Sequence, residues 1–316
     1  MLTLLLRRAG FSLLSLVIVT SCLFLLTRAI PDSPARIVLG QDASEAQVTQ
    51  FEIDHGLDRS VIEQYAAWVD GLLLHGDLGT SFITGRPVLR DITSTLPVTL
   101  ELVVIAFMFS FVLSLVAGTA SALLRDTVLD YAVRLIAVLG VSVPGFWLAL
   151  VLIMALAVDR DWFPPGGVEP LSAGLAAHLD SIVLPTFCLA IFYMAALSRM
   201  TRSSMLDVLG QDYMRTARAA GLARGRVLIY ALRNALVPVV TIAGMSFGYM
   251  FGWALIIESV FNIDGLSRAL LTAIQQRDFV LVQGVVMVFT FIFILANLVA
   301  DITNAWLNPR IAATAA

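Results

Sequence analysis

Few residues in this 316-residue chain are of the types that carry out chemistry. Its three histidines, His55, His75 and His178, are scattered, so they can form a metal site only if the fold gathers them. Its two cysteines, Cys22 and Cys188, lie in apolar runs and have neither disulfide nor zinc-ligand spacing. Every basic residue is arginine, whereas a P-loop needs a lysine to reach the nucleotide phosphates. The sequence therefore indicates no catalytic site, no metal site and no P-loop of its own.

The remainder of the chain is dominated by apolar runs. It is 59% hydrophobic, has a mean hydropathy of +0.89, and contains six long stretches without a charged side chain. Each stretch is long enough to cross about 30 Å of hydrocarbon as a helix. The sequence predicts an all-α, polytopic membrane protein with six transmembrane helices, at residues 9–27, 102–124, 135–158, 181–198, 234–257 and 279–300.

The arginines predict the orientation of these spans. If the N-terminus is cytoplasmic, loops 125–134 and 199–238 are inside and most of the arginines lie on that side. The short loop 158–180, placed outside, has one arginine and four acidic residues. The long outside loop 31–96 has two capping-box spacings, Ser44 with Gln47 and Ser60 with Glu63, so we expect two helices to begin there. Both termini are expected to be cytoplasmic.

The inside loop 199–238 has the most distinctive pattern in the chain. It carries seven arginines and two aspartates, and it predicts a first short helix over 211–220. Gly221 then stands where a glycine with positive φ would end that helix. A second helix with an apolar strip is expected over 225–235, and Pro238 opens the next apolar run. The first helix, the glycine turn and the strip together would form a compact unit that another protein could grip. The simpler interpretation is a basic cytoplasmic loop with no further role.

The order of residues in this loop resembles a known family. The run YMRTARAAGL at residues 213–222 is similar to the EAA coupling loop of ABC importer permeases, and more closely to their peptide/nickel subfamily. Arg215 and Thr216 replace the glutamate and first alanine of the broad pattern, and the late proline is displaced to Pro238. Further matching runs extend over nearly the whole chain, at residues 55–58, 75–82, 86–88, 96–102, 258–261, 264–266 and 307–310.

The resemblance implies a type I ABC importer permease fold in a bacterial inner membrane. The predicted spans and loops divide the chain into a first transmembrane helix (1–30), an external helical loop (31–96), a five-helix permease core (97–306) that includes the cytoplasmic loop 199–238, and a cytoplasmic tail (307–316). The resemblance implies binding-protein-dependent peptide transport, with a homologous second permease, two ABC ATPase subunits and an extracytoplasmic substrate-binding protein as partners. ATP and Mg²⁺ would be bound by the ATPases, and this chain would need no cofactor. The resemblance assigns ATPase coupling to Tyr213, Arg215, Thr216, Ala217, Arg218, Ala219, Ala220, Gly221, Leu222 and Arg226.

Alternatives remain at the level of substrate and of class. Nickel, glutathione or another small solute is an alternative to di- and oligopeptides. A transporter or channel that works without ATP is a more remote alternative, and it would be expected to hold a charged residue at mid-membrane. No Asp, Glu or His lies within the six predicted spans. A membrane scaffold protein is the remaining rival.

Two glycine patterns within the spans are candidates for the pore or for helix packing. Pro144 and Gly145 interrupt the third span, which predicts a kink or, as a sharper hypothesis, a ligand-binding break. Gly244, Gly248 and Gly252 recur every four residues in the fifth span and form one smooth helix face. That face would pack within the chain's own bundle, against a partner subunit or along the pore.

Overall fold

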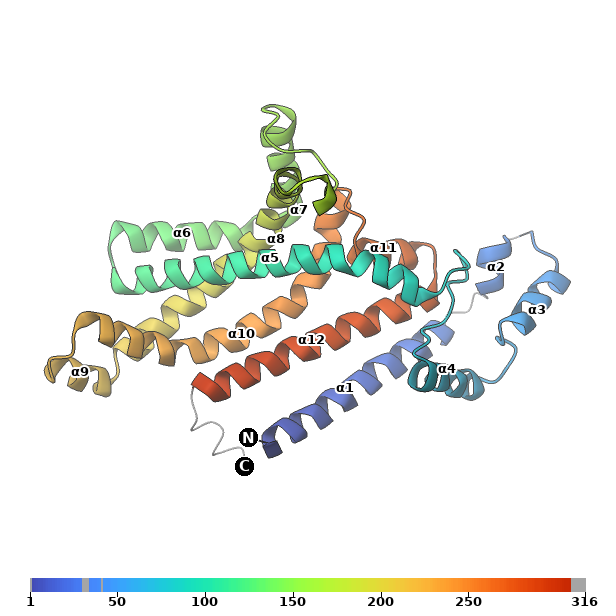
Figure 1. Ribbon diagram of the computed structural model, residues 1–316, viewed down its shortest axis with the longest axis horizontal. Coiled ribbons are helices and arrows are strands. Elements are labelled where there is room, and N and C mark those ends of the chain that lie inside the picture. The colour runs from blue at the N-terminus through green and yellow to red at the C-terminus, as the bar shows by residue number, and fades with distance from the viewer. Residues whose placement is uncertain (1, 30–33, 41, 308–316) are drawn as a thin grey trace. The chain divides into compact units, whose positions relative to one another are not determined.

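The computed structural model describes residues 2–29, 34–40 and 42–307, with side chains from residue 10 onward. The side chains of Arg7 and Arg8 and the predicted tail motif beyond Leu307 lie outside the described residues. All of the described secondary structure apart from one isolated bridge is helical (Figure 1). The helices are α1 (Leu2–Ala29), α2 (Pro34–Leu39), α3 (Glu45–Asp54), α4 (Val61–His75), α5 (Val88–Leu123), α6 (Val128–Ser142), α7 (Gly145–Leu152), the π-helix η1 (Ile153–Val158), the 3₁₀ turn η2 (Leu171–Ala173), α8 (Leu175–Leu209), α9 (Asp212–Ala219), α10 (Arg224–Val260), α11 (Leu266–Gln275) and α12 (Phe279–Leu307).

Five of the described helices, α1, α5, α8, α10 and α12, are long and apolar enough to cross a membrane. The predicted third span is broken, because α6 and the segment Gly145–Val158 meet at an angle of 101°. The count is therefore five spans, or six if the bent pair is one span, and the all-α polytopic prediction is confirmed. Of the two alternatives predicted at Pro144, a kink and a break, the structure has a break: α6 ends at Ser142, and Val143 and Pro144 have extended backbone. Whether a ligand binds there stays a prediction.

Three prolines lie inside long helices instead of ending them. Pro97 is inside α5, Pro185 inside α8 and Pro238 inside α10. The predicted break before Pro238 is therefore wrong, since one helix runs from Arg224 to Val260. A proline removes one hydrogen bond of the ladder, and neighbouring helices and local adjustments make this tolerable in a membrane protein.

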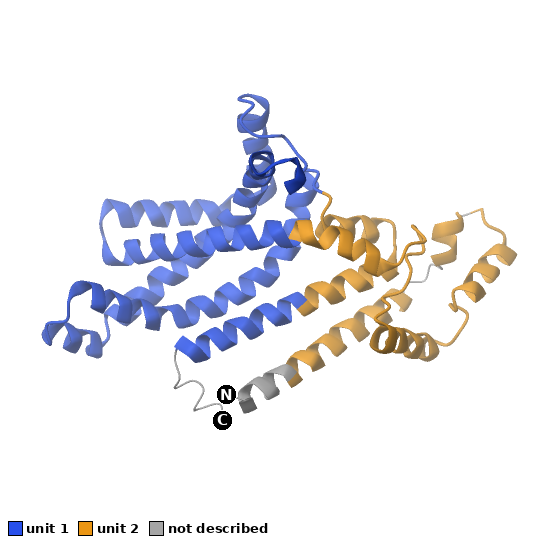
Figure 2. Cartoon of the chain, in the orientation of Figure 1, with its two compact units in different colours: residues 1–9, 100–263, 292–316 blue, residues 10–99, 264–291 orange. Residues whose placement is uncertain are grey.

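The chain divides into two compact units, residues 1–9, 100–263 and 292–316 in one and residues 10–99 and 264–291 in the other (Figure 2). The four-part division drawn from the sequence follows expected membrane topology rather than packing, and it stays a prediction. The unit that contains residues 10–99 has a core formed by the start of α5, by α11 and by the start of α12, with Leu78, Val88, Ile92, Leu266, Ala273, Leu281, Val282 and Val285 buried.

The two helices predicted to lie outside the membrane, α3 and α4, begin as the sequence predicts. Ser44 and Ser60 are the N-caps of α3 and α4, and both form complete capping boxes with Gln47 and Glu63. The apolar face of α4 contacts α1: the rings of Tyr65 and Trp68 lie 5.3 and 5.7 Å from that of Phe24. The Tyr65 hydroxyl is 2.6 Å from the Ser21 hydroxyl. The partner of this amphipathic helix is thus the first span.

The other unit holds the predicted inside loops and is built on α8, which packs against α6, α7 and α10. Small residues allow the closest approaches. A Cβ built on Gly118 of α5 would lie 2.6 Å from the carbonyl oxygen of Ser198 in α8. A Cβ on Gly248 of α10 would lie 2.0 Å from the Phe293 ring of α12. These helices are therefore in contact at distances that only glycine permits.

Candidate functional site

The short helix α9 ends at a glycine, as the sequence predicts. Gly221 has φ +77°, in the left-handed region. Its N–H donates to the carbonyl oxygen of Arg218 at 3.0 Å, and the Leu222 N–H donates to that of Ala217 at 3.3 Å. These two bonds are those of a Schellman motif, which satisfies the last carbonyls of a helix. The chain consequently reverses at Gly221 and enters α10 three residues later.

Most of the predicted coupling residues lie on the surface. Tyr213, Arg215, Thr216, Arg218, Ala219, Ala220, Gly221 and Arg226 are exposed, and Ala217 and Leu222 are partly buried. Arg215 pairs with Asp212 one turn earlier, at 3.4 Å, with both side chains in solvent. The structure thus brings all ten residues together in one exposed helix–turn–helix (the coupling turn, residues 212–226). Their role in coupling stays a prediction.

One residue of α9 faces the other way and anchors it. Met214 is 1% exposed and belongs to a buried cluster with Ala122, Met205, Ala231 and Ala235. The apolar strip on the start of α10, which includes Val227, Leu228 and Leu232, packs against the same cluster. The strip thus packs against the chain's own core, and the expectation that another protein grips the unit formed by the two helices and the turn stays a prediction. The coupling turn is fixed to α5, α8 and α10 through this cluster.

Arg218 has a structural contact that the sequence did not indicate. Its Nη2 donates to the carbonyl oxygen of Leu209, the last residue of α8, at 2.6 Å. A cation at the C-terminus of a helix is favoured by the partial negative charge there. Arg218 therefore ties α9 to the end of α8, whatever else it contacts in a complex.

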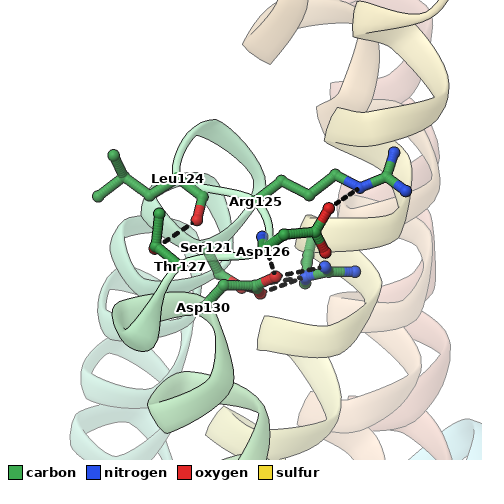
Figure 3. Close-up of polar contacts among 7 residues, drawn as sticks. Ser121, Leu124, Arg125, Asp126, Thr127 and Asp130 are labelled. Atoms are coloured by element: carbon green, nitrogen blue, oxygen red, sulfur yellow. Dashed lines mark hydrogen bonds and ion pairs between the residues drawn. The ribbon is translucent and has the colours of Figure 1, made fainter.

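A buried ion pair lies near the start of α6, at the loop expected to be inside. Arg202 of α8 donates through Nε to Oδ1 of Asp130 and through Nη2 to Oδ2, both at 2.7 Å. Ser121 of α5 also donates to Oδ1, and the backbone N–H of Asp126 donates to Oδ2 at 3.1 Å (Figure 3). The Asp130 side chain is fully buried, and Nε of Arg202 also donates to the Ser121 hydroxyl at 3.1 Å. Three helices, α5, α6 and α8, are thereby joined at one carboxylate.

The predicted pore or packing glycines separate into two groups. Gly244 and Gly248 face α12, where a Cβ would meet Ala300 at 2.6 Å and Phe293 at 2.0 Å. Gly252 and Gly145 have no neighbouring atom within 4 Å of such a Cβ. The first two pack helix against helix, and the last two face open space.

The histidines do not gather. His178 is buried, with Nε2 2.8 Å from Oε1 of Glu101 and Nδ1 2.6 Å from the carbonyl oxygen of Glu169. His55 is exposed and stacks on Phe51. Among the described residues, no three His, Cys, Asp or Glu side chains are grouped as metal ligands.

Comparison with known proteins identifies the class to which this arrangement belongs. Residues 110–313 match the family described as the binding-protein-dependent transport system inner membrane component, and residues 1–103 match the N-terminal part of such membrane components. A putative peptide transport system permease protein of Brucella suis biovar 1 is 38% identical over 98% of this chain and 99% of its own length. The oligopeptide transport system permease protein AppB of Bacillus subtilis is 37% identical, over 96% and 98%. The di/tripeptide transport system permease protein DppB of Pseudomonas aeruginosa is 36% identical, over 98% and 99%.

These matches confirm the resemblance found in the sequence, and they cover both the coupling turn and the external helices. The chain belongs to the family of inner-membrane components of binding-protein-dependent transport systems, as a multi-pass transport subunit.

Proposed function

We propose that this chain is the permease subunit of an ATP-driven importer that moves di- or oligopeptides into the cytoplasm. The relatives just described support this substrate class, because all three are named as peptide, oligopeptide or di/tripeptide permeases and align over almost their entire length. The peptide would be delivered by an extracytoplasmic binding protein. Both termini of the chain would be cytoplasmic, in agreement with the distribution of arginines.

The coupling turn carries this proposal. It presents exposed Tyr213, Arg215 and Arg218 on a helix of eight residues, while Met214 is buried beneath it. A short helix that is fixed on one face and free on the other fits a groove on a partner protein. We assign that groove to an ABC ATPase subunit, which would bind ATP and Mg²⁺ in place of this chain.

The same contacts give a route for motion. Closure of the ATPases would displace α9, and the Met214 cluster would pass the displacement to α5, α8 and α10. The Asp130–Arg202 pair would keep α6 moving with α8. Because these contacts join the helices, the helices would move as rigid bodies, and this movement would open the transport path to one side of the membrane at a time. A second, homologous permease and two ATPase subunits would complete the complex.

Reconstitution tests this function directly. The chain is co-expressed with its sister permease, the two ATPases and the binding protein, and the complex is placed in proteoliposomes. We expect ATP-dependent uptake of labelled di- or oligopeptide that requires the binding protein. A complex without this chain is the control for leakage. Binding-protein-dependent uptake of a metal ion or another solute, with no uptake of peptides, would contradict the proposed substrate class.

A further inference from the structure

The break between α6 and α7 opens a pocket of about 230 Å³ within one compact unit. The broken segment 141–146 forms one wall, and α8 and α10 contribute the rest through Cys188, Leu189, Phe192, Tyr193, Trp253, Ile256 and Ile257. No charged side chain is among the lining residues. Part of the lining is aromatic, with the ring centroids of Phe192 and Trp253 stacked at 5.4 Å.

The start of α7 supplies backbone donors to this pocket. Its N-cap is Pro144, which makes no side-chain cap, and the first N–H that bonds back is that of Leu148, to the carbonyl oxygen of Pro144 at 3.0 Å. The N–H groups of Gly145, Phe146 and Trp147 precede that bond, and such N-terminal groups have no partner inside their own helix. In an apolar surrounding, unpaired N–H groups are costly, and the helix dipole makes this end attractive to oxygen acceptors.

A buried side chain gives independent support. Tyr193 lines the same pocket and is 4% exposed, and its hydroxyl has no hydrogen-bond partner among the described residues. Burial of a hydroxyl without a partner costs stability. The Tyr193 hydroxyl is thus a second donor without an acceptor in the lining of this pocket.

Gly145 leaves the backbone accessible at this point. A Cβ built on it meets no atom within 4 Å, and its φ is not positive. Neither packing nor backbone conformation therefore requires glycine here. What the absence of a side chain does provide is close approach of another molecule to the peptide N–H groups.

We propose that this pocket is a binding subsite for one residue of a peptide in transit. A main-chain oxygen of the peptide, carbonyl or terminal carboxylate, accepts hydrogen bonds from the α7 N-terminus and from the Tyr193 hydroxyl. The apolar part of that residue lies against Phe192 and Trp253. The volume is below the roughly 300–1,000 Å³ of pockets that enclose a whole drug-sized ligand, so one residue is held rather than a complete oligopeptide. The inference rests on the proposed peptide-import function and adds a site to it.

Two variants separate this site from a structural role. Tyr193→Phe removes only the unpaired hydroxyl, and Gly145→Ala adds one methyl group in open space at a helix start. We expect both variants to fold at least as well as wild type, because one loses a buried hydroxyl that has no partner and the other replaces glycine by a better helix former. In the complete reconstituted complex we expect each to lower peptide uptake at saturating binding protein by roughly three- to tenfold, as loss of one hydrogen bond implies. Tyr131→Phe and Gly10→Ala, at exposed helical positions that are not part of the pocket lining, are matched controls that should transport normally.

Occupancy of the pocket by peptide can be measured separately from uptake, through protection of a thiol from alkylation. In a Cys22→Ser background, which keeps the pocket-lining Cys188 and is itself the control for alkylation of that thiol, Ser142→Cys places a thiol at the exposed edge of the pocket. Its alkylation by a small maleimide should slow when peptide, loaded binding protein and ATP are present. Normal uptake by both Tyr193→Phe and Gly145→Ala, or alkylation that peptide never changes, would overturn the subsite. If the wild-type complex moves no peptide at all, the proposed function fails instead.

Discussion

Arg202 of α8 and Asp130 of α6 form a two-point ion pair, with Nε···Oδ1 and Nη2···Oδ2 both at 2.7 Å, although 72 residues separate them in the chain. The carboxylate is fully buried and the arginine is largely so. Because Ser121 of α5 also donates to the carboxylate, one acidic side chain holds three helices together (Figure 3). A buried pair of this kind is stabilising only while both partners are present.

A double-mutant cycle tests that dependence. Asp130→Asn and Arg202→Gln should each lower the unfolding temperature of the purified chain, because each leaves the remaining group without its opposite charge. The unfolding temperature of the double variant should fall by less than the sum of the decreases in the two single variants. Additive losses, measured by thermal unfolding in detergent, would mean that the two side chains do not depend on each other.

The anchor of α9 can be tested through protease sensitivity. Met214→Ala should weaken the packing of α9 by about 2 kcal/mol or more, because it empties a fully buried position. Cleavage within residues 210–226 should accelerate in inside-out vesicles. Met245→Ala is the matched control, since Met245 lies in α10 and is 40% exposed. Equal cleavage rates for the two variants would contradict the buried anchor.

The glycines of α10 offer an internal comparison. Gly248→Leu should force α10 and α12 apart, since even a Cβ would approach Phe293 to 2.0 Å. We expect uptake to fall more than membrane insertion does. Gly252→Leu places its side chain in open space, and this variant should insert into the membrane to the same level as wild type, as measured by membrane immunoblot. Unchanged uptake by the Gly248→Leu variant at normal expression would show that transport does not depend on close contact between α10 and α12.

Orientation is tested with single cysteines in a Cys22→Ser, Cys188→Ala background. Ser203→Cys, in an exposed position near the end of α8, should react only with reagents that reach the cytoplasm. Asp58→Cys, exposed between α3 and α4, should react from outside. The arginine distribution predicts this result. Labelling of position 203 by an impermeant maleimide in intact cells would show that the orientation is the reverse of the one predicted.

Local features of the fold were predictable because neighbouring residues determine them. The positive φ of Gly221 and the capping boxes at Ser44 and Ser60 follow from residues within one or two helical turns. The helices that cross a membrane follow from their length and apolar composition.

The missed features depend on tertiary contacts or on competition between local effects. Pro238 predicted a helix break, yet packing of α10 against its neighbours overrides the loss of one hydrogen bond. Met214 looked like any apolar residue of a short helix, and its burial depends on Met205 and Ala231 from other parts of the chain. The 101° angle at Pro144 and Gly145 could not be told from a kink, because a Pro-Gly pair permits both.

The central claim is that the coupling turn transmits motion from an ATPase to the membrane helices. Gly221→Val places a β-branched residue at φ +77°, which costs about 1–2 kcal/mol and disrupts the Schellman motif without touching the apolar core. Gly10→Val is the matched control, since Gly10 lies in α1, outside the coupling turn, and faces open space with no positive φ.

The decisive measurement is ATP hydrolysis by the reconstituted complex with and without peptide-loaded binding protein. The Gly221→Val complex should assemble and reach the membrane, but loaded binding protein should no longer stimulate its ATP hydrolysis, whereas the Gly10→Val complex should respond as wild type does. Normal uptake and normal stimulated hydrolysis in the Gly221→Val complex would mean that residues 212–226 form only a basic loop, and the claim would be wrong.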